Sequence, residues 1–347
     1  MPRIVDVLRQ HKVAIIFTTI GVILSPFAAV ILNEYITITP RMLSGILEDD
    51  EVSVLDRILN ITEGAKSKAN VLEFNDIRKE FKQPIRIEGL DLSNKTLTGV
   101  NLDSVVFLNS NLSGANLQKS ELNSVQISGD LSSINLSNAS LLSADLSDSD
   151  LSDANLKDAL FANADVTDSL FTGADLTDAD FRYADLTDAD FRYADLTDAY
   201  LLDANLLDAD LRYANLTDVD LSYADLTDAD LSNASLTDAD LSNANLNRAI
   251  IDFANLTNAD LSNANLNRAI IDFANLTNAS LRHADLTQAD LRGSYLTNAS
   301  LLLADLDGSL FDCNSVRTAN FTVNTSQVHI VDSNLNVVSN CSVNLHE

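Results

Sequence analysis

The chain repeats one pattern of side chains every five residues over most of its length of 347 residues. From Leu131 to Phe321 a large apolar residue, almost always Leu or Phe, occupies every fifth position. A small residue, usually Ala, lies two places before it, and Asp or Asn stands between the two. A step of five turns an α-helix by about 140° and moves a strand residue to the opposite face, so neither element buries this pattern. We therefore predict that each unit forms one short extended side and one corner of a coil.

Longer echoes in the sequence indicate the number of sides in each coil. Residues 261–280 repeat residues 241–260 with only the last residue changed, to Ser280. The larger unit therefore has twenty residues, which corresponds to a square coil with four sides. Equivalent residues of successive coils are expected to stack at the strand spacing of about 4.8 Å, with right-handed connections between parallel neighbours.

A break in the register occurs once along the repeat. The first set of apolar centres runs from Ile87 to Ile127, and Leu131 follows after four residues instead of five. We interpret this as a one-residue deletion at a corner, where Gly129 supplies an unusual backbone conformation. Counted through to Phe321, the centres predict about twelve coils.

The repeated unit, for example ADLTD at residues 184–188, resembles the A-(D/N)-L-x-x motif of the pentapeptide-repeat family. The resemblance extends from Ile87 to Phe321. It implies an all-β domain at residues 86–323, a right-handed quadrilateral parallel β-helix. Because the inward residues are Leu, Phe and Ala, we expect a filled interior in which each coil contacts only its neighbours.

The N-terminal region contains a candidate membrane anchor. Residues 13–32 are uncharged and mainly apolar, which is long enough for a transmembrane helix. The positive-inside rule then assigns residues 1–12 to the cytoplasm and the repeats to the extracytoplasmic side of a single-pass membrane protein. This assignment depends on three basic residues before the span: Arg3, Arg9 and Lys12. A cleaved signal peptide and a buried or interfacial helix are the alternatives.

The two ends of the rod need protection, because an open sheet edge invites pairing with other chains. For residues 33–85 we predict a helical linker and an N-terminal cap, with a loose stalk as the alternative. Residues 324–347 keep a weakened repeat, which predicts a degenerate C-terminal coil. Extrapolation of the coil count places Cys313 and Cys341 on different sides of the rod, so we expect free thiols.

The outer surface is strongly acidic and regularly patterned. The net charge is −29, and residues 141–240 alone contain 25 Asp and four basic residues. A column of Thr follows one side, which suggests two interpretations: a copied surface residue, or an array that matches a repetitive lattice such as ice or a polysaccharide. Loose binding of divalent cations by the Asp columns is a further alternative. The column is Thr177, Thr197, Thr217, Thr237, Thr257, Thr277 and Thr297.

Aromatic residues project from one side of the predicted rod, next to Arg. Exposed aromatic residues beside Arg are typical of protein interfaces, whereas mutual stacking that stiffens the rod is the alternative. The Phe pair, at positions 253 and 273, is the first candidate contact point because it is the least soluble. The candidate interaction surface comprises Tyr193, Tyr213, Phe253, Phe273, Arg192 and Arg212.

The sequence contains no recognisable catalytic, cofactor or metal motif, since its four His residues are scattered and do not pair with Cys at metal-ligand spacing. We therefore predict a non-enzymatic, membrane-anchored, rod-like scaffold. Its acidic, Thr- and aromatic-patterned surface would bind a protein or an envelope polymer, or another copy through the C-terminal end. The family resemblance implies an alternative, an acidic DNA mimic that binds a type II topoisomerase. The predicted anchor argues against that alternative and against nucleic acid as a partner.

Overall fold

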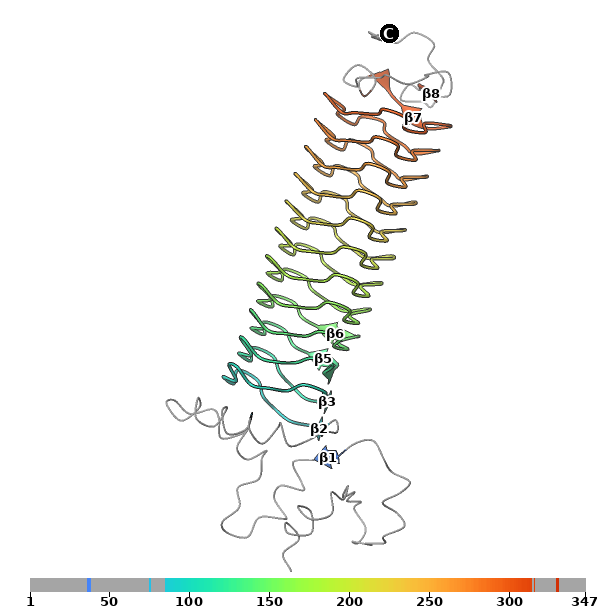
Figure 1. Ribbon diagram of the computed structural model, residues 1–347. Coiled ribbons are helices and arrows are strands. Elements are labelled where there is room, and N and C mark those ends of the chain that lie inside the picture. Colours follow the sequence, from blue (N-terminus) through green and yellow to red (C-terminus); the bar gives the residue numbers. More distant parts are fainter. Residues whose placement is uncertain (1–35, 39–74, 76–84, 314, 316–328, 331–347) are drawn as a thin grey trace, which may run out of the picture.

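The computed structural model describes residues 36–38, 75, 85–313, 315 and 329–330 (Figure 1). From residue 85 to 313 the chain winds into a straight rod whose turns stack along one axis. Parallel bridges join residues twenty positions apart, from Asn135↔Asn155 to Asp290↔Leu310, and a tight turn follows every fifth residue. The predicted four-sided parallel coil of twenty residues is therefore confirmed. The full count of twelve coils includes Val316 and Phe321, which lie outside the described residues.

Short strands mark the two ends of the rod and the register break. One sheet has the parallel order β1-β2-β3-β4, which comprises β1 (Ile36–Ile38), β2 (Ile85–Glu88), β3 (Val105–Leu108) and β4 (Gln126–Ile127). Two further parallel pairs are β5 (Gly129–Asp130) with β6 (Ser149–Asp150) and β7 (Leu310–Phe311) with β8 (His329–Ile330). Elsewhere on the rod the sides are joined by single bridges.

One repeat unit shows why the sequence has its pattern. In the unit at residues 184–188, four backbone N–H groups donate to backbone carbonyl oxygens over 2.7–3.0 Å. The N–H of Ala184 donates within the preceding turn, and that of Asp185 donates to the previous coil. The N–H groups of Leu186 and Asp188 donate to the next coil. Thr187 N–H donates to the side-chain Oδ1 of Asp185 at 3.2 Å. All five backbone donors are thus paired, as buried amides require. Asp or Asn is needed before the central Leu because its side chain closes this local turn.

The last residue of each unit lies in the left-handed region of backbone space. Asp188 has a φ of 56°, and Ala189 N–H donates to Leu186 O at 3.1 Å across the corner. These are the features of a type II turn, which requires a positive φ at its third residue. Asp and Asn tolerate this conformation better than most residues, which explains why they fill so many of the corners.

The interior of the rod is filled by the apolar centres and the small residues before them. Leu186 is fully buried and Ala184 is 2% exposed, and the other units repeat this arrangement. Where Phe replaces Leu, rings of successive coils stack: Phe161 and Phe181 have centroids 4.6 Å apart, and Phe171 contacts Phe181 edge-on at 6.0 Å.

The predicted deletion is confirmed at the corner before Leu131. Gly129 has a φ of 115°, which differs from the values near 60° at the regular corners. Bridges across this corner join residues nineteen apart, as in Gln126↔Asp145, and the offset returns to twenty beyond it.

The N-terminal edge of the rod is paired by segments that precede it. The strand β1 lies within the region predicted as a helical linker, so that prediction is wrong for residues 36–38; its Ile-Thr-Ile sequence favours a strand, and it extends the sheet beside β2. Asn75 has helical backbone, and its side chain donates to Gly99 O at 2.8 Å and accepts from Asn101 N–H at 2.7 Å. The rest of the predicted cap lies outside the described residues.

The C-terminal edge corrects the prediction for the cysteines. Cys313 is disulfide-bonded, so the expectation of free thiols is wrong. That expectation placed Ile330 on the coil after Phe311, which the structure confirms, and then counted further sides of five residues to Cys341, but the backbone becomes helical at Cys313. The coil count therefore no longer applies there. Cys341, the second cysteine of the sequence, lies outside the described residues, as does most of the predicted C-terminal coil.

The described part of the chain contains no helix long and apolar enough to cross a membrane. The predicted span at residues 13–32 is not among the described residues, so the anchor remains a prediction.

Candidate interaction face

The six candidate residues all lie on one side of the rod, at equivalent positions of successive coils. We call this side the aromatic face. It is formed by six segments twenty residues apart: 190–193, 210–213, 230–233, 250–253, 270–273 and 290–293. In each segment the third residue follows the buried centre and the fourth occupies the left-handed corner, which is Gly293 in the last segment. The aromatic side chains at these corners are exposed.

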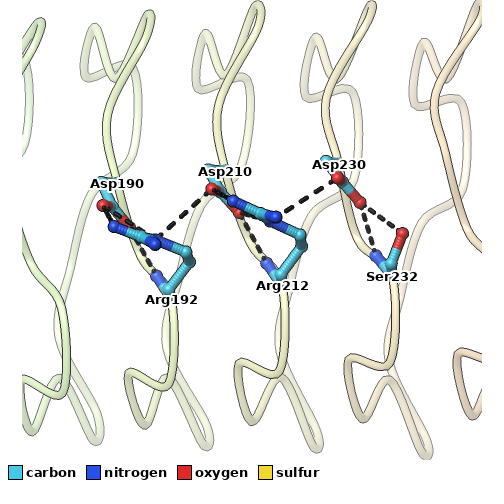
Figure 2. A network of polar contacts seen from close by, with 6 residues as sticks. All are labelled: Asp190, Arg192, Asp210, Arg212, Asp230 and Ser232. Carbon is cyan, nitrogen blue, oxygen red and sulfur yellow. Dashed lines mark hydrogen bonds and ion pairs between the residues drawn. The ribbon is translucent and has the colours of Figure 1, made fainter.

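The first half of the aromatic face carries a ladder of alternating Asp and Arg (Figure 2). Asp190 accepts hydrogen bonds from the backbone N–H and from Nε of Arg192, at 3.0 and 2.9 Å. Arg192 Nε also lies 3.4 Å from Asp210 Oδ2 on the next coil, and Arg212 Nε lies 3.6 Å from Asp230 Oδ2. Each guanidinium therefore joins two successive coils, and this half of the face is electrostatically self-satisfied.

The ladder also changes the acidity of Asp190. Partial burial acts to raise the pKa of Asp190, but the hydrogen bonds from Arg192 outweigh it and hold the pKa below its ordinary value. Asp190 therefore stays ionised at neutral pH.

The second half of the aromatic face departs from this pattern in two coils. Ile250 and Ile270 occupy the positions of the ladder Asp residues, while Asp252 and Asp272 occupy those of Arg192 and Arg212. Without an Asp at position 270, the N–H of Asp272 donates instead to the Asp252 carboxylate of the previous coil. Oδ1 of both Asp252 and Asp272 is buried and has no hydrogen-bond partner among the described residues.

Both of these carboxyl groups have perturbed acidity. The pKa of Asp272 is raised to about 7, first by burial and then by the neighbouring carboxyl of Asp290, through a shared hydrogen bond and its charge. Arg292 opposes the shift only weakly, since its Nη2 lies 3.9 Å from Asp272 Oδ2. Burial also raises the pKa of Asp252. Asp272 is thus the member of the coupled pair that holds a proton near neutrality, because burial of Asp290 is outweighed by hydrogen bonds from Arg292 that lower the pKa of Asp290.

The aromatic residues form two stacked pairs on this face. Tyr193 and Tyr213 have ring centroids 5.1 Å apart, as have Phe253 and Phe273, and each pair is within 7° of parallel. All four side chains nevertheless remain between 51% and 61% exposed. The mutual stacking considered from the sequence is therefore present, and it leaves a large apolar surface in water.

Gly293 closes the second stack at its C-terminal side. It has a φ of 72°, and a Cβ there would come within 2.5 Å of the Phe273 ring. The ring therefore lies directly against the backbone of the next coil, a contact that the sequence analysis missed. Asp252, Asp272, Asp290 and Arg292 were not among the predicted site residues, although the replacement of Asp by Ile at positions 250 and 270 of the repeat is visible in the sequence.

The Thr column on an adjacent side is hydrogen-bonded within the rod. Thr197 Oγ1 donates to Asp195 Oδ1 at 2.6 Å and accepts from Asn215 Nδ2 of the next coil at 2.8 Å. Thr257 makes equivalent bonds with Asn255 and Asn275. Hydroxyls that are used in this way stabilise coil contacts and are poorly available to an external lattice. Within the described residues, no group of three or more His, Cys, Asp or Glu could hold a metal ion.

Comparisons with known proteins agree with the repeat. A family model described as Pentapeptide repeats matches eight copies between residues 91 and 312. HetL, a pentapeptide repeat protein involved in heterocyst differentiation regulation from the cyanobacterium Nostoc sp. strain PCC 7120, is 31% identical, and the match covers 55% of this chain and 89% of HetL with a TM-score of 0.44. No curated protein matches significantly.

Two further solved structures are similar to this chain, one over a shorter part and the other over a longer part at lower identity. Rfr23 from the cyanobacterium Cyanothece 51142 is 47% identical, with 26% of this chain and 61% of Rfr23 covered and a TM-score of 0.26. QnrB1, a plasmid-mediated fluoroquinolone resistance protein, is 19% identical, with 73% and 93% covered and a TM-score of 0.26. Because these TM-scores are below 0.5, the fold assignment rests on the family match and the coil geometry.

Proposed function

Because the chain belongs to the pentapeptide-repeat family, whose members are generally structural or interaction proteins, we propose that it is a membrane-anchored scaffold whose aromatic face binds a partner protein. The observation that carries the proposal is the exposure of four aromatic side chains on one face of a rod with a filled interior. A protein partner is favoured over an envelope polymer because Tyr, Phe and Arg are the residues enriched at protein interfaces.

Two features support an extracytoplasmic rod that stands on the membrane. The strand β1 begins at Ile36, four residues after the end of the predicted span, and four extended residues reach about 13 Å. An anchor at residues 13–32 would therefore hold the first coil close to the bilayer. The disulfide at Cys313 is also typical of proteins in oxidising compartments outside the cytoplasm.

Site-specific photocrosslinking tests the partner-binding face in intact cells. Benzoylphenylalanine replaces Phe253 in the full chain and, as a matched control, Tyr223 on the opposite side of the rod; both positions are left-handed corners with 59% exposed side chains. A protein adduct is expected from position 253 and not from position 223. Equal adducts from both positions, or none from position 253, would reject the aromatic face as the binding surface.

Topology is tested separately, by addition of protease to intact cells. The proposal requires that the repeats are digested from outside, with residues 1–12 protected. Protection of the repeats would reject the extracytoplasmic assignment and leave the binding face to be judged by crosslinking.

A second candidate function follows from the acidic surface. The Asp-rich segment at residues 141–240 gives the rod a dense negative charge, which is a feature of proteins that mimic DNA toward a type II topoisomerase. Inhibition or protection of gyrase supercoiling by the full chain at micromolar concentration would support this function. The absence of any effect would eliminate it.

A further inference from the structure

The two halves of the aromatic face differ in how well their polar groups are satisfied. In the Tyr half, Arg192 and Arg212 each donate to an Asp of their own coil and approach an Asp of the next. In the Phe half, Asp252 and Asp272 each keep one buried oxygen with no partner in the described part of the chain. Polar groups left in this state destabilise a rod on its own. The Asp272 side chain is nevertheless 24% exposed, so a partner can reach its carboxylate.

The Phe half also exposes an apolar patch formed by the stacked rings of Phe253 and Phe273. Phe253 and Phe273 are 59% and 52% exposed, and Ile270 beside them is 39% exposed. The patch is bounded by Asn233 on the N-terminal side and by Gly293 on the C-terminal side. Apolar groups held together in this way on a rigid surface mark contact sites, because their burial against a partner is favourable.

The charge around this patch is negative. Asp230 and Asp290 flank Asp252 and Asp272, and each of these neighbours acts to raise the pKa of the Asp beside it. Arg292 donates to Asp290 and lies within 4 Å of Asp272, so its charge is already shared. A partner that covers the patch must therefore supply positive charge, whereas an acidic or neutral partner would bury uncompensated carboxylates.

We propose that the Phe253–Phe273 patch binds a basic amphipathic segment of the partner protein. Aliphatic side chains of the segment would cover the two rings, and Lys or Arg side chains would pair with Asp252 and Asp272. This inference rests on the proposed scaffold function and specifies the chemistry of its partner. The overall charge of −29 would also steer such a segment toward the rod before contact.

Peptide binding to the full chain in lipid nanodiscs tests the inference. The probe is an 18-residue peptide of Leu and Lys with helical periodicity, and the reference peptide has Glu in place of Lys. Binding of the Lys peptide but not of the Glu peptide is expected. All protein variants share the same nanodisc, so binding of the peptide to lipid cancels in comparisons between them.

The neighbouring coil provides substitutions that fit the fold. Asn233 and Ser232 occupy the equivalent positions one coil before Phe253 and Asp252, so Asn and Ser suit these sites. Two double variants change the patch: one removes its two Phe rings and the other removes its two Asp carboxyl groups. Two control double variants leave the patch intact and remove two exposed Tyr rings or two Asp carboxyl groups elsewhere on the rod. The patch variants are F253N/F273N and D252S/D272S, and the controls are Y193N/Y213N and D188N/D208N.

Each patch variant should weaken binding of the Lys peptide about tenfold or more, and each control by less than about twofold. Equal losses in D188N/D208N would show general attraction to an acidic rod and would overturn the inference, as would failure of the wild type to bind. If D252S/D272S loses the circular dichroism spectrum of the folded protein, the inference is judged on peptide binding to F253N/F273N alone. A crosslinked partner at position 253 that contains no basic amphipathic segment would reject this inference while it supports the scaffold function.

Discussion

The side chain of Asp210 is expected to serve two separable purposes, and a pair of substitutions distinguishes them. Its carboxylate accepts from the Arg212 backbone N–H at 3.1 Å, which closes the local turn, and from Arg212 Nε at 2.8 Å. It also lies 3.4 Å from Arg192 Nε of the previous coil. Asp210→Asn keeps an oxygen for the backbone donor and removes the negative charge, whereas Asp210→Ala removes both.

The magnitudes follow from these contacts. Asp210→Asn loses two ion pairs whose guanidinium groups are more than 40% exposed, and solvent screening leaves such pairs with little effect on stability. Asp210→Ala also leaves the Arg212 N–H without its acceptor, which costs about 1–3 kcal/mol for a buried donor. The two variants should therefore differ by about 1–3 kcal/mol, which corresponds to about 5- to 150-fold in an equilibrium constant.

Hydrogen exchange at the Arg212 amide measures this difference where it arises. In the full chain, Asp210→Asn should leave the amide nearly as protected as in the wild type, and Asp210→Ala should accelerate its exchange by about 5- to 150-fold. Asn occupies the same repeat position at Asn205 and Asn215, so Asn at 210 introduces no new strain. Equal acceleration in both variants would refute the reasoning, because it would assign the stabilisation to charge alone.

Three further predictions concern the ends and the acidic cluster. Asn75→Ala should speed exchange at the Asn101 amide, with little change beyond the first coils, because a solenoid transmits stability only between neighbours. The raised pKa of Asp272 means that its stabilising contribution is complete below about pH 4 and is lost as the pH rises through about 7. After correction for the base-catalysed rise in intrinsic exchange, the protection of amides in its coil should therefore fall from pH 6 to 8, and Asp272→Asn should abolish this fall. Cys313→Ser should loosen the C-terminal coil by about 2–4 kcal/mol, read as faster exchange at Leu310.

The coil and the placement of the aromatic residues could be predicted from the sequence because both follow from counting. A five-residue period has one geometric solution, and a step of twenty places Tyr213 above Tyr193 whatever the side chains between them do. The corner at Gly129 was predictable for the same reason, since a missing residue shifts every later centre.

Features that depend on side-chain orientation or on departures from the repeat were not predictable in this way. Whether Arg192 bonds to its own Asp or to that of the next coil depends on its rotamer, and the structure shows contacts with both. The pairing of Ile36 with Ile85 joins residues far apart in a segment without a repeat. The error at Cys313 has the same origin, because the count was continued after the chain had left the coil.

The Phe patch illustrates how a solenoid converts sequence duplication into surface. Residues 241–260 and 261–280 are nearly identical, so the unusual unit Ile-Ile-Asp-Phe occurs twice and its side chains stack on each other. Duplication alone explains why there are two Phe residues. It also doubles a local loss of stability, because each copy lacks the Asp that closes the turn. Each copy also leaves a buried carboxylate oxygen without a hydrogen-bond partner in the described structure. A rod that needed only stability would gain from the ordinary Asp at positions 250 and 270. The retention of two destabilising units beside two exposed rings is therefore the pattern expected where stability is exchanged for binding.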